Sequence, residues 1–527
     1  MLPAMNDPSL KARLITEILR ARSRVYHVGQ RTPLEPMRIN GEDFHLFVKR
    51  EDLSPINAYK WRGAYNCIKI LSDEGEAGPF VAASAGNHAQ GVALAARKLG
   101  LPAKIFMPLS TPRMKQQSVE RLGGAMIEVV LEGDDYNVAG AAAKAYAKEH
   151  GHTYIHPFDD LRTIAGQATI ADEIVLSGEG PFDYAFLQIG GGGMAAGVAV
   201  WLKEHYPAIK IVGVEEADQA CMKAAIEAGE PVTLDKVDTF CDGTAVTRAG
   251  DLTFALCRET LDTIVTVSNE ETCAAIQRFW ESKRVIPEAS GALGLAGVLH
   301  YAERYPEELC GKRVLTVVSG ANADFGKIPL FVANSAVGAN RKRFYRFHIN
   351  EKGGSLLGIL DTVFADVSVH EFQYGKISAK DAWPIVALEA RPDKLEALHD
   401  SMKAHGIDFE DVTSAPDVRF RIINYNPALF HDPLIMHVHF PERRGALRDL
   451  LRKISDVANI CYFNYQYSGE SIGRALMGFE FDSPEKRATF LDIIRNSVVT
   501  ARPVEPETAK RILAYSREDL SSGSWCK

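Results

Sequence analysis

Two separated segments carry residue types that could act together in chemistry. The first places Lys60 inside the run 57–65, where its amine could serve as a nucleophile or a base. The second is four glycines and a methionine between a strand-like and a helix-like run: Gly190, Gly191, Gly192, Gly193 and Met194. Glycines at a helix start leave backbone N–H groups free to converge on an anion such as a phosphate. The sequence therefore predicts a reactive amine beside an anion cradle.

This glycine run matches neither of two common nucleotide-binding patterns. A P-loop requires Lys-Ser or Lys-Thr after its last glycine, and dinucleotide folds use Gly-x-Gly-x-x-Gly. Met194 and Ala195 follow the run here, so both patterns are absent. A lysine elsewhere must supply the chemistry, and Lys60 is the candidate.

The elements that must position these residues alternate along the first 335 residues or so. Short apolar runs at 80–83, 103–107, 125–130 and 209–214 are each set against a helix-like stretch. This order is typical of parallel sheets covered by helices on both faces, with ligands at the carboxyl ends of the strands. The loop that starts at Ser84 and the glycine run both follow predicted strands, so we expect them at such ends.

The C-terminal third repeats itself at a fixed offset. Residues 351–357 align with 442–448, and residues 372–374 align with 463–465. Each copy predicts a strand, a glycine turn, a helix, two more strands and a second helix, which together form a small ferredoxin-like sandwich. Two copies leave open whether both bind a ligand or one is purely structural.

The glycine turns of the two copies are candidate ligand sites. A helix N-terminus that begins at Gly354 or Gly445 could receive a carboxylate. Aromatic residues in the following strands either border such a ligand or pack one copy on the other. These aromatics are Phe372, Tyr374, Phe463 and Tyr465.

Composition excludes several classes of protein. The 527 residues are 46% hydrophobic and 24% charged, which with this length predicts about three globular domains. The net charge of −8 offers no basic field for nucleic acid. No apolar run reaches the roughly 20 residues of a membrane span, and the N-terminus lacks the apolar core of a signal peptide. We therefore expect a cytosolic protein without a membrane partner.

Two further local patterns concern the N-terminus and the cysteines. Residues 8–25 alternate charged residues with Leu, Ile and Ala at helical spacing, which predicts an amphipathic helix on the catalytic core. The eight cysteines stand singly, without CxxC pairs or zinc spacing, so we expect neither a disulfide framework nor a zinc site.

Seven blocks, taken together and in this order, resemble pyridoxal-phosphate enzymes of the tryptophan-synthase-β type, and among them the biosynthetic threonine dehydratases. They are residues 48–52, 57–65, 84–91, 156–160, 190–194, 287–292 and 319–322. The resemblance covers nearly the whole chain. It implies an α/β catalytic domain of two subdomains at 1–335, with the smaller subdomain at about 60–160. Two ACT-like regulatory units follow at 336–425 and 426–510, and a tail at 511–527 has no assigned function.

The resemblance assigns roles around a pyridoxal 5′-phosphate cofactor. Lys60 bonds the cofactor aldehyde and later removes the substrate α-proton, while Asn87 contacts the 3′-oxygen of the ring. The glycine run with Met194 holds the phosphate. Ser319 faces the pyridine nitrogen, where a neutral hydroxyl gives a weaker electron sink that suits β-elimination. The α-carboxylate of the substrate is held by backbone N–H groups of the loop Ser84, Ala85, Gly86, Asn87 and His88.

The implied activity is that of a threonine ammonia-lyase, which converts L-threonine to 2-oxobutanoate and ammonia at the start of isoleucine synthesis. Such enzymes are commonly homotetramers that isoleucine inhibits and valine activates. A serine-preferring deaminase or a β-replacement enzyme of the same fold stays open, because one methyl group is worth only about 1–3 kcal/mol. A catalytically silent amino-acid sensor is the alternative from another class, and the intact Lys60, Asn87 and Ser319 argue against it.

Four positions bear on how far the resemblance extends. Ala58 replaces a serine common in the family, which puts one cofactor contact in doubt. Ala85 stands where serine racemases carry a second catalytic serine, which disfavours racemisation. Cys221 occupies a position where those racemases bind a divalent ion through an acid, so we expect no required metal. Trp201 and Tyr206 are candidates for subunit contacts.

Overall fold

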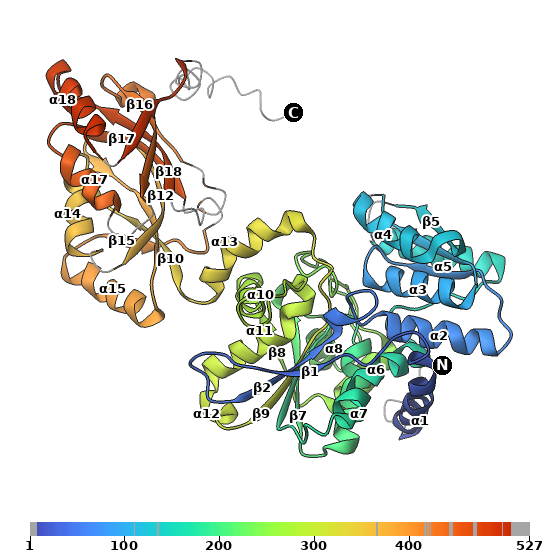
Figure 1. The fold of residues 1–527 in the computed structure, drawn as a ribbon. Coiled ribbons are helices and arrows are strands. Elements are labelled where there is room, and N and C mark those ends of the chain that lie inside the picture. The colour runs from blue at the N-terminus through green and yellow to red at the C-terminus, as the bar shows by residue number, and fades with distance from the viewer. Residues whose placement is uncertain are drawn as a thin grey trace. The chain divides into compact units, whose positions relative to one another are not determined.

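The computed structural model divides the chain into two compact units, Met1–Gly338 and Ala339–Lys527. It describes residues 8–109, 111–133, 136–364, 367–415, 418, 421, 423–441, 446–466, 472–497 and 499–506. Figure 1 shows the course of the chain through its helices and strands. Gly445 and the whole of the tail 511–527 lie outside the described residues.

A six-stranded sheet forms the centre of the first unit. Its order is β1-β2-β9-β6-β7-β8, and all neighbours are parallel except β1 and β2. The strands are β1 (Leu34–Met37), β2 (His45–Arg50), β6 (Tyr184–Gln188), β7 (Lys210–Glu216), β8 (Thr263–Val267) and β9 (Arg313–Val318). Continuous apolar runs such as those of β6 and β9 are buried on both faces, as a parallel sheet requires.

Helices cover both faces of this sheet. One buried cluster joins the strands to α1 (Pro8–Val25), α6 (Leu161–Leu176), α7 (Gly193–His205), α8 (Cys221–Ala228) and α9 (Asp251–Thr260). Another joins them to α10 (Asn269–Lys283), α11 (Ala289–Arg304), α12 (Pro306–Leu309) and α13 (Ile328–Gly338). The predicted N-terminal helix is present, with Leu10, Leu14 and Ile18 buried against the core.

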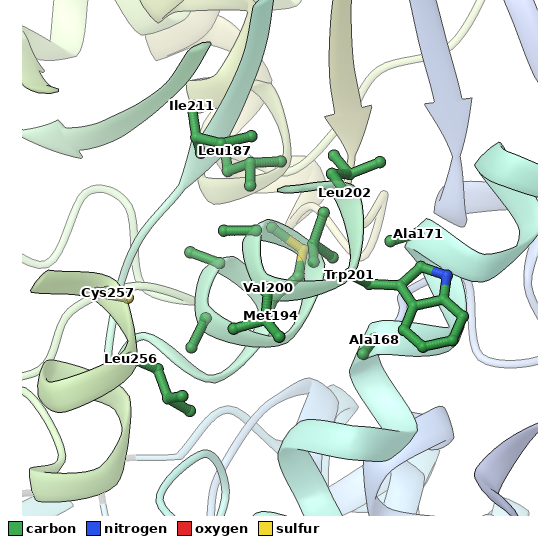
Figure 2. Packing of buried hydrophobic residues seen from close by; sticks show 14 of the residues in the cluster. Ala168, Ala171, Leu187, Met194, Val200, Trp201, Leu202, Ile211, Leu256 and Cys257 are labelled. Carbon is green, nitrogen blue, oxygen red and sulfur yellow. The ribbon is translucent and has the colours of Figure 1, made fainter. Parts of the chain in front are cut away.

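Trp201 has a different role from the one its sequence predicts. Figure 2 shows its indole on α7 beside Ala168 and Ala171 of α6, and only 3% of Trp201 is exposed. A side chain buried in the core of its own chain is not offered to another subunit. The expectation of a subunit contact through Trp201 is therefore wrong.

A three-stranded parallel sheet forms the smaller part of the first unit. It consists of β3 (Phe80–Ala83), β4 (Ala103–Met107) and β5 (Ile127–Leu131). Four helices accompany it: α2 (Trp61–Asp73), α3 (Asn87–Leu99), α4 (Arg113–Gly123) and α5 (Tyr136–His150). The last strand begins two residues later than the sequence predicts, because Gly124, at a φ of 57°, opens a 3-10 turn over Gly124–Met126.

The second unit is one antiparallel sheet built from both sequence repeats. Its order is β15-β10-β14-β12-β17-β18-β16-β19. The first copy supplies β10 (Lys342–Phe347), β12 (Ser368–Gly375), β14 (Ile385–Glu389) and β15 (Phe409–Asp411). The second supplies β16 (Leu434–Pro441), β17 (Asn459–Gln466), β18 (Ile472–Glu480) and β19 (Thr500–Pro503). A two-stranded ribbon pairs β11 (Ile349–Asn350) with β13 (Asp381–Ala382).

Each copy also contributes two helices, as the repeat predicts. They are α14 (Ser355–Thr362), α15 (Pro392–Ala404), α17 (Ala446–Ile454) and α18 (Pro484–Arg495). The copies meet where β12 pairs with β17, which sets Phe372 opposite Tyr465 and Tyr374 opposite Phe463. No helix in the described part of the chain is long and apolar enough to cross a membrane.

Candidate active site

One cavity in the first unit collects the residues that the sequence singled out. Its volume is about 480 Å³. Its walls include Lys60, Ser84, Ala85, Gly86, Asn87, His88, Gly190, Gly191, Gly192, Gly193, Met194, Glu288 and Ser319. The Ser84 loop follows β3, the glycine run follows β6 and Ser319 follows β9. The cavity therefore lies at the carboxyl ends of parallel strands in both sheets, where α/β folds place ligands.

Lys60 immediately precedes α2 and reaches into this cavity. Its Nζ donates to the Pro157 carbonyl oxygen at 3.3 Å. Burial lowers the pKa of the Lys60 amine to about 8, although the nearby Glu288 opposes that shift. A lysine with such a pKa holds a useful fraction of neutral, nucleophilic amine near neutral pH.

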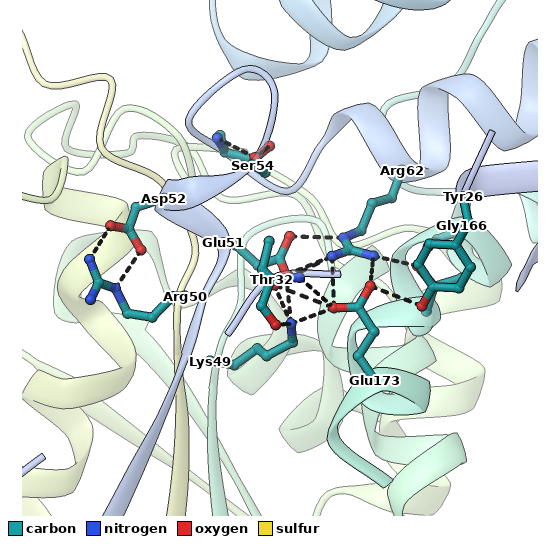
Figure 3. Close-up of polar contacts among 12 residues, drawn as sticks. Tyr26, Thr32, Lys49, Arg50, Glu51, Asp52, Ser54, Arg62, Gly166 and Glu173 are labelled. Atoms are coloured by element: carbon teal, nitrogen blue, oxygen red, sulfur yellow. Dashed lines mark hydrogen bonds and ion pairs between the residues drawn. The ribbon is translucent and has the colours of Figure 1, made fainter. Parts of the chain in front are cut away.

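A buried ionic network anchors the first turn of α2, the helix that follows Lys60. Arg62 is fully buried and its guanidinium contacts Glu51 at 2.8 Å and Glu173 at 2.6 Å. Lys49 also pairs with Glu173, and Thr32 links the partners by hydrogen bonds. Figure 3 shows these side chains converging from β2, α2 and α6. Burial opposes ionisation of Glu51, yet Arg62 and Lys49 lower its pKa to about 2.

The backbones of α2 and α6 touch beside that network. A Cβ added to Gly166 would lie 2.6 Å from the Arg62 carbonyl oxygen and 2.6 Å from the Gly63 Cα. Only glycine leaves room for helices at this separation. The close contact and the ionic network together fix the start of α2, which directly follows Lys60.

The glycine run forms the opposite wall and opens α7. Gly192 has a φ of 95°, which few residues other than glycine adopt. A Cβ on Gly191 would lie 2.4 Å from the ring of Phe158. The first bond within α7 joins the Ala196 N–H to the Gly192 oxygen at 2.8 Å, so the preceding N–H groups have no acceptor inside the helix. They are available to an anion, as the sequence predicts.

Asp159 and Thr253 support the glycine run through hydrogen bonds outside the cavity lining. The sequence analysis gives neither residue a role. The Asp159 carboxylate accepts N–H bonds from Asp251, Leu252 and Thr253 at 2.9–3.2 Å and so caps α9. Thr253 Oγ1 then donates to the Gly191 carbonyl oxygen at 2.6 Å. Asp159 belongs to the block 156–160 that resembles the family, but no local pattern shows that it binds the start of α9, some 90 residues away.

The Ser84 loop turns into α3, whose N-terminus faces the cavity. Ser84 Oγ accepts the Gly86 N–H at 3.1 Å and closes the loop. His88 is buried and its Nε2 donates to the Ile155 carbonyl oxygen at 3.0 Å. Burial, assisted by Lys60, lowers the pKa of His88 to about 3, so the imidazole stays neutral. Its contacts are those of a residue that shapes the loop.

Asn87 and Glu288 meet across the cavity. Asn87 Nδ2 donates to Glu288 Oε1 at 2.6 Å. Burial raises the pKa of the Glu288 carboxyl to about 7, and Asp242 adds to the effect while the Asn87 bond opposes it. Ser319 is also buried, and its carbonyl oxygen accepts the Tyr59 N–H at 3.1 Å, which ties the β9 end to the residue before Lys60.

Glu215, near the end of β7, precedes Cys221, the position that corresponds to the racemase ion site. Its carboxylate accepts the N–H groups of Met222 and Lys223 at 2.8 and 2.9 Å and caps α8. Burial raises its pKa to about 7. Within the described residues, no group of three His, Cys, Asp or Glu side chains is arranged to hold a metal ion.

A second pocket lies in the second unit, at the glycine turn of the first repeat. Gly354, Phe372 and Tyr374 line it, together with residues of α17 and β17. Phe463 and Tyr465 are buried instead in the core between the copies, where Phe463 stacks on Phe372 with ring centroids 4.5 Å apart. All four aromatics thus pack in the core between the copies, and Phe372 and Tyr374 also line the pocket.

Comparison with known proteins agrees with both units. A family described as "Pyridoxal-phosphate dependent enzyme" matches residues 25–320, and "C-terminal regulatory domain of Threonine dehydratase" matches residues 431–512. The chain is 40% identical to the biosynthetic L-threonine dehydratase of Haemophilus influenzae, over 90% of this chain and 92% of that protein. It is 37% identical to the chloroplastic biosynthetic threonine dehydratase of Arabidopsis thaliana, over 88% of this chain and 78% of that protein.

A solved structure gives the same result. The processed form of threonine deaminase isoform 2 from Solanum lycopersicum is 39% identical, with a TM-score of 0.59 over 63% of this chain and 94% of that one. The chain belongs to the pyridoxal-phosphate-dependent enzyme family. It also carries the C-terminal regulatory domain of threonine dehydratases, and its relatives of that name span bacteria, plants and fungi.

The cavity fits the cofactor of this family. The glycine run supplies free N–H groups for a phosphate, and a Cβ at Gly191 would clash with the wall behind it. Lys60 supplies an amine of lowered pKa. When bound, pyridoxal phosphate withdraws electrons from the α-carbon of an attached amino acid and so acidifies its α-proton. Lys60, the glycine run, Asn87 and Ser319 are the residues that would hold it.

The pKa of Lys60 predicts how cofactor uptake depends on pH. Only the neutral amine attacks an aldehyde, and its fraction grows as pH rises toward the pKa of about 8. We expect the rate at which cofactor-free protein takes up pyridoxal phosphate to rise about tenfold per pH unit below that value, then level off. Stopped-flow absorbance measures this rate. A flat profile between about pH 6 and pH 9 would show that the amine is not titrating in this range.

Proposed function

We propose that this protein is a threonine ammonia-lyase that converts L-threonine to 2-oxobutanoate and ammonia. The observation that carries the proposal is the placement of Lys60, the anion-binding glycine run and the N-terminus of α3 around one cavity. Such a site can bind a cofactor phosphate at the glycine run and a substrate carboxylate at α3, with the Lys60 amine between the elements that bind them. The threonine dehydratases to which the chain is similar over about nine-tenths of its length support this choice of substrate.

The chain's own groups divide the work. The N–H groups between Ser84 and His88, at the start of α3, receive the α-carboxylate of the substrate, where the helix dipole favours an anion. The released Lys60 amine removes the α-proton, which its lowered pKa permits near neutral pH. Proton transfer from a nearby group must accompany loss of the β-hydroxyl, because hydroxide is a poor leaving group.

The substrate is tested by comparing L-threonine with L-serine. We expect kcat/KM for 2-oxobutanoate formation from threonine to exceed that for pyruvate formation from serine by roughly 10-fold or more, since one methyl group is worth about 1–3 kcal/mol. A reversed ratio would make the enzyme a serine deaminase. Release of neither keto acid would instead favour β-replacement chemistry.

The pocket of the second unit is the candidate effector site. Its polar end carries Glu351, which accepts hydrogen bonds from the Tyr374 hydroxyl and, at 3.0 Å, from Asn459 Nδ2. The N-terminus of α14 after Gly354 supplies N–H groups for a carboxylate. An apolar wall suits a branched aliphatic side chain: Leu356, Leu357, Leu451, Ile454 and Ile460. The branched side chains of isoleucine and valine both suit this wall, and we propose isoleucine as the inhibitor and valine as the activator.

Replacing Glu351 tests the effector site. If Glu351 receives the ammonium group of the effector, Glu351→Gln should weaken isoleucine binding by roughly 10- to 100-fold, the worth of one charge-assisted hydrogen bond. Isothermal titration of the full-length protein measures this. The matched control is Glu410→Gln, whose carboxylate is 66% exposed and which does not line the pocket. Equal affinity in the wild type and both variants would place the effector elsewhere.

A further inference from the structure

Asn322 lies in the cavity wall and joins two segments that the site uses. It follows β9 by four residues, between Ser319 and the 3-10 turn Phe325–Lys327 that leads into α13. Its Nδ2 donates to the Ile56 carbonyl oxygen at 2.8 Å and to Asn87 Oδ1 at 2.7 Å. Asn87 Nδ2 in turn donates to Glu288 Oε1. Three side chains from distant parts of the sequence thus form one hydrogen-bonded row.

The chemistry at the two ends of this row fixes its direction. The Ile56 peptide oxygen can only accept, so Asn322 must present Nδ2 there, and the second hydrogen of that group points at Asn87. Asn87 must then present Oδ1 to Asn322 and Nδ2 to the Glu288 carboxylate. A flipped Asn322 amide would place Oδ1 against the Ile56 carbonyl oxygen, and a flipped Asn87 amide would place Oδ1 against the Glu288 carboxylate. The orientation of Asn87 is therefore decided by Asn322.

The surrounding backbone makes Asn322 a rigid support. The Ala321 N–H donates to the Asn57 oxygen at 2.9 Å, and the Glu288 N–H donates to the Gly320 oxygen at 3.2 Å. A Cβ on Gly320 would lie 2.4 Å from Glu288 Oε1. The segment that carries Asn322 thus lies directly against the residues before Lys60 and against the Glu288 loop.

We infer that Asn322 is a positioning residue that fixes the Asn87 amide toward the bound cofactor and, through Asn87, the Glu288 carboxylate. This inference rests on the proposed function, because it takes Asn87 as a cofactor contact. Asn322 acts through Asn87, so its contribution disappears once Asn87 is replaced. That dependence separates it from a residue that only stabilises the fold.

A double-mutant cycle on the full-length holoenzyme tests the inference. We expect Asn322→Ala and Asn87→Ala to shift the visible absorption and circular dichroism bands of the bound cofactor in the same direction. Asn322→Ala should lower kcat/KM by up to about 100-fold, as small misplacements of site groups do. Added to Asn87→Ala, it should change kcat/KM by less than about twofold and leave the bands where Asn87→Ala put them.

Controls separate positioning from folding. Asn66→Ala removes a buried asparagine whose Nδ2 donates to the Arg162 carbonyl oxygen at 2.7 Å, away from the cavity lining. It should lower the melting temperature and leave the cofactor bands unchanged. Should Asn322→Ala not fold, Asn322→Asp keeps the volume but sets an acceptor against Ile56 O and Asn87 Oδ1, and it should give the same spectral shift.

Two results would overturn the inference. One is a cofactor spectrum in Asn322→Ala that matches the wild type while only stability falls. The other is a double variant in which the two losses in kcat/KM multiply. If the wild-type protein takes up no cofactor, both the proposed function and this inference are wrong. If it takes up the cofactor, the results above test this inference alone.

Discussion

Replacing Lys60 with alanine should reduce deamination of threonine by about 10⁴-fold or more, because the amine serves both as the bond to the cofactor and as the base. The structure shows a half-buried amine in the cavity, with its pKa lowered to about 8. The visible absorption band of the lysine-linked cofactor should vanish in Lys60→Ala. Keto-acid assays and absorbance spectra of the purified protein measure both effects.

A control on the same helix makes that result specific. Lys69 lies on α2, and its amine is paired with Asp73 at the surface, outside the cavity lining. Lys69→Ala should keep both the band and the activity. An unchanged spectrum in Lys60→Ala would mean that another lysine bonds the cofactor.

Replacing Arg62 with methionine should lower the free energy of unfolding of the first unit by about 3–5 kcal/mol, the usual result of removing one partner from a buried ionic group. Arg62 is fully buried between Glu51 and Glu173. Its loss leaves two buried carboxylates that share the single charge of Lys49. Hydrogen exchange of α2 and α6 in the full-length protein reports this free energy.

The matched control removes an arginine whose ion pair is partly exposed. Arg278 and Glu281 pair at 3.2 Å with 34% and 41% of their side chains exposed. Arg278→Met should change stability by no more than about 0.5 kcal/mol. Arg62→Met should also raise the KM for cofactor, because α2 begins beside Lys60. Equal protection in both variants would show that the ionic network does not anchor the helix.

Much of the catalytic unit is predictable from its sequence because its signals are local. The glycine run, the Ser84 loop and Ser319 each follow an apolar strand, and parallel strands bring such loops to one edge. The repeat likewise predicts a strand, a helix, two strands and a second helix in each regulatory copy, and the structure confirms them. It adds a last strand to each copy, β15 or β19, and the short strands β11 and β13 to the first. The N-terminal helix is bounded as its amphipathic pattern predicts.

The remaining features depend on contacts between distant residues, which no local pattern encodes. Asp159 caps a helix 90 residues away, and Asn322 orients a side chain 235 residues before it. The sequence offers Trp201 as a candidate for a subunit contact, whereas α6 covers its side chain in the folded chain. The burial of Trp201 depends on the packing of α6 against α7, and the sequence of α7 alone does not predict which helix packs on it.

The most direct test of the active-site assignment locates the cofactor on the chain. The full-length protein is loaded with pyridoxal phosphate, treated with borohydride to reduce the lysine–cofactor bond, digested and analysed by mass spectrometry. We predict that the added mass of the reduced cofactor falls on the peptide that contains Lys60, and that excess L-threonine present before reduction lowers this labelling. Labelling of a different lysine, or of none, would contradict the assignment of Lys60 as the residue that bonds the cofactor.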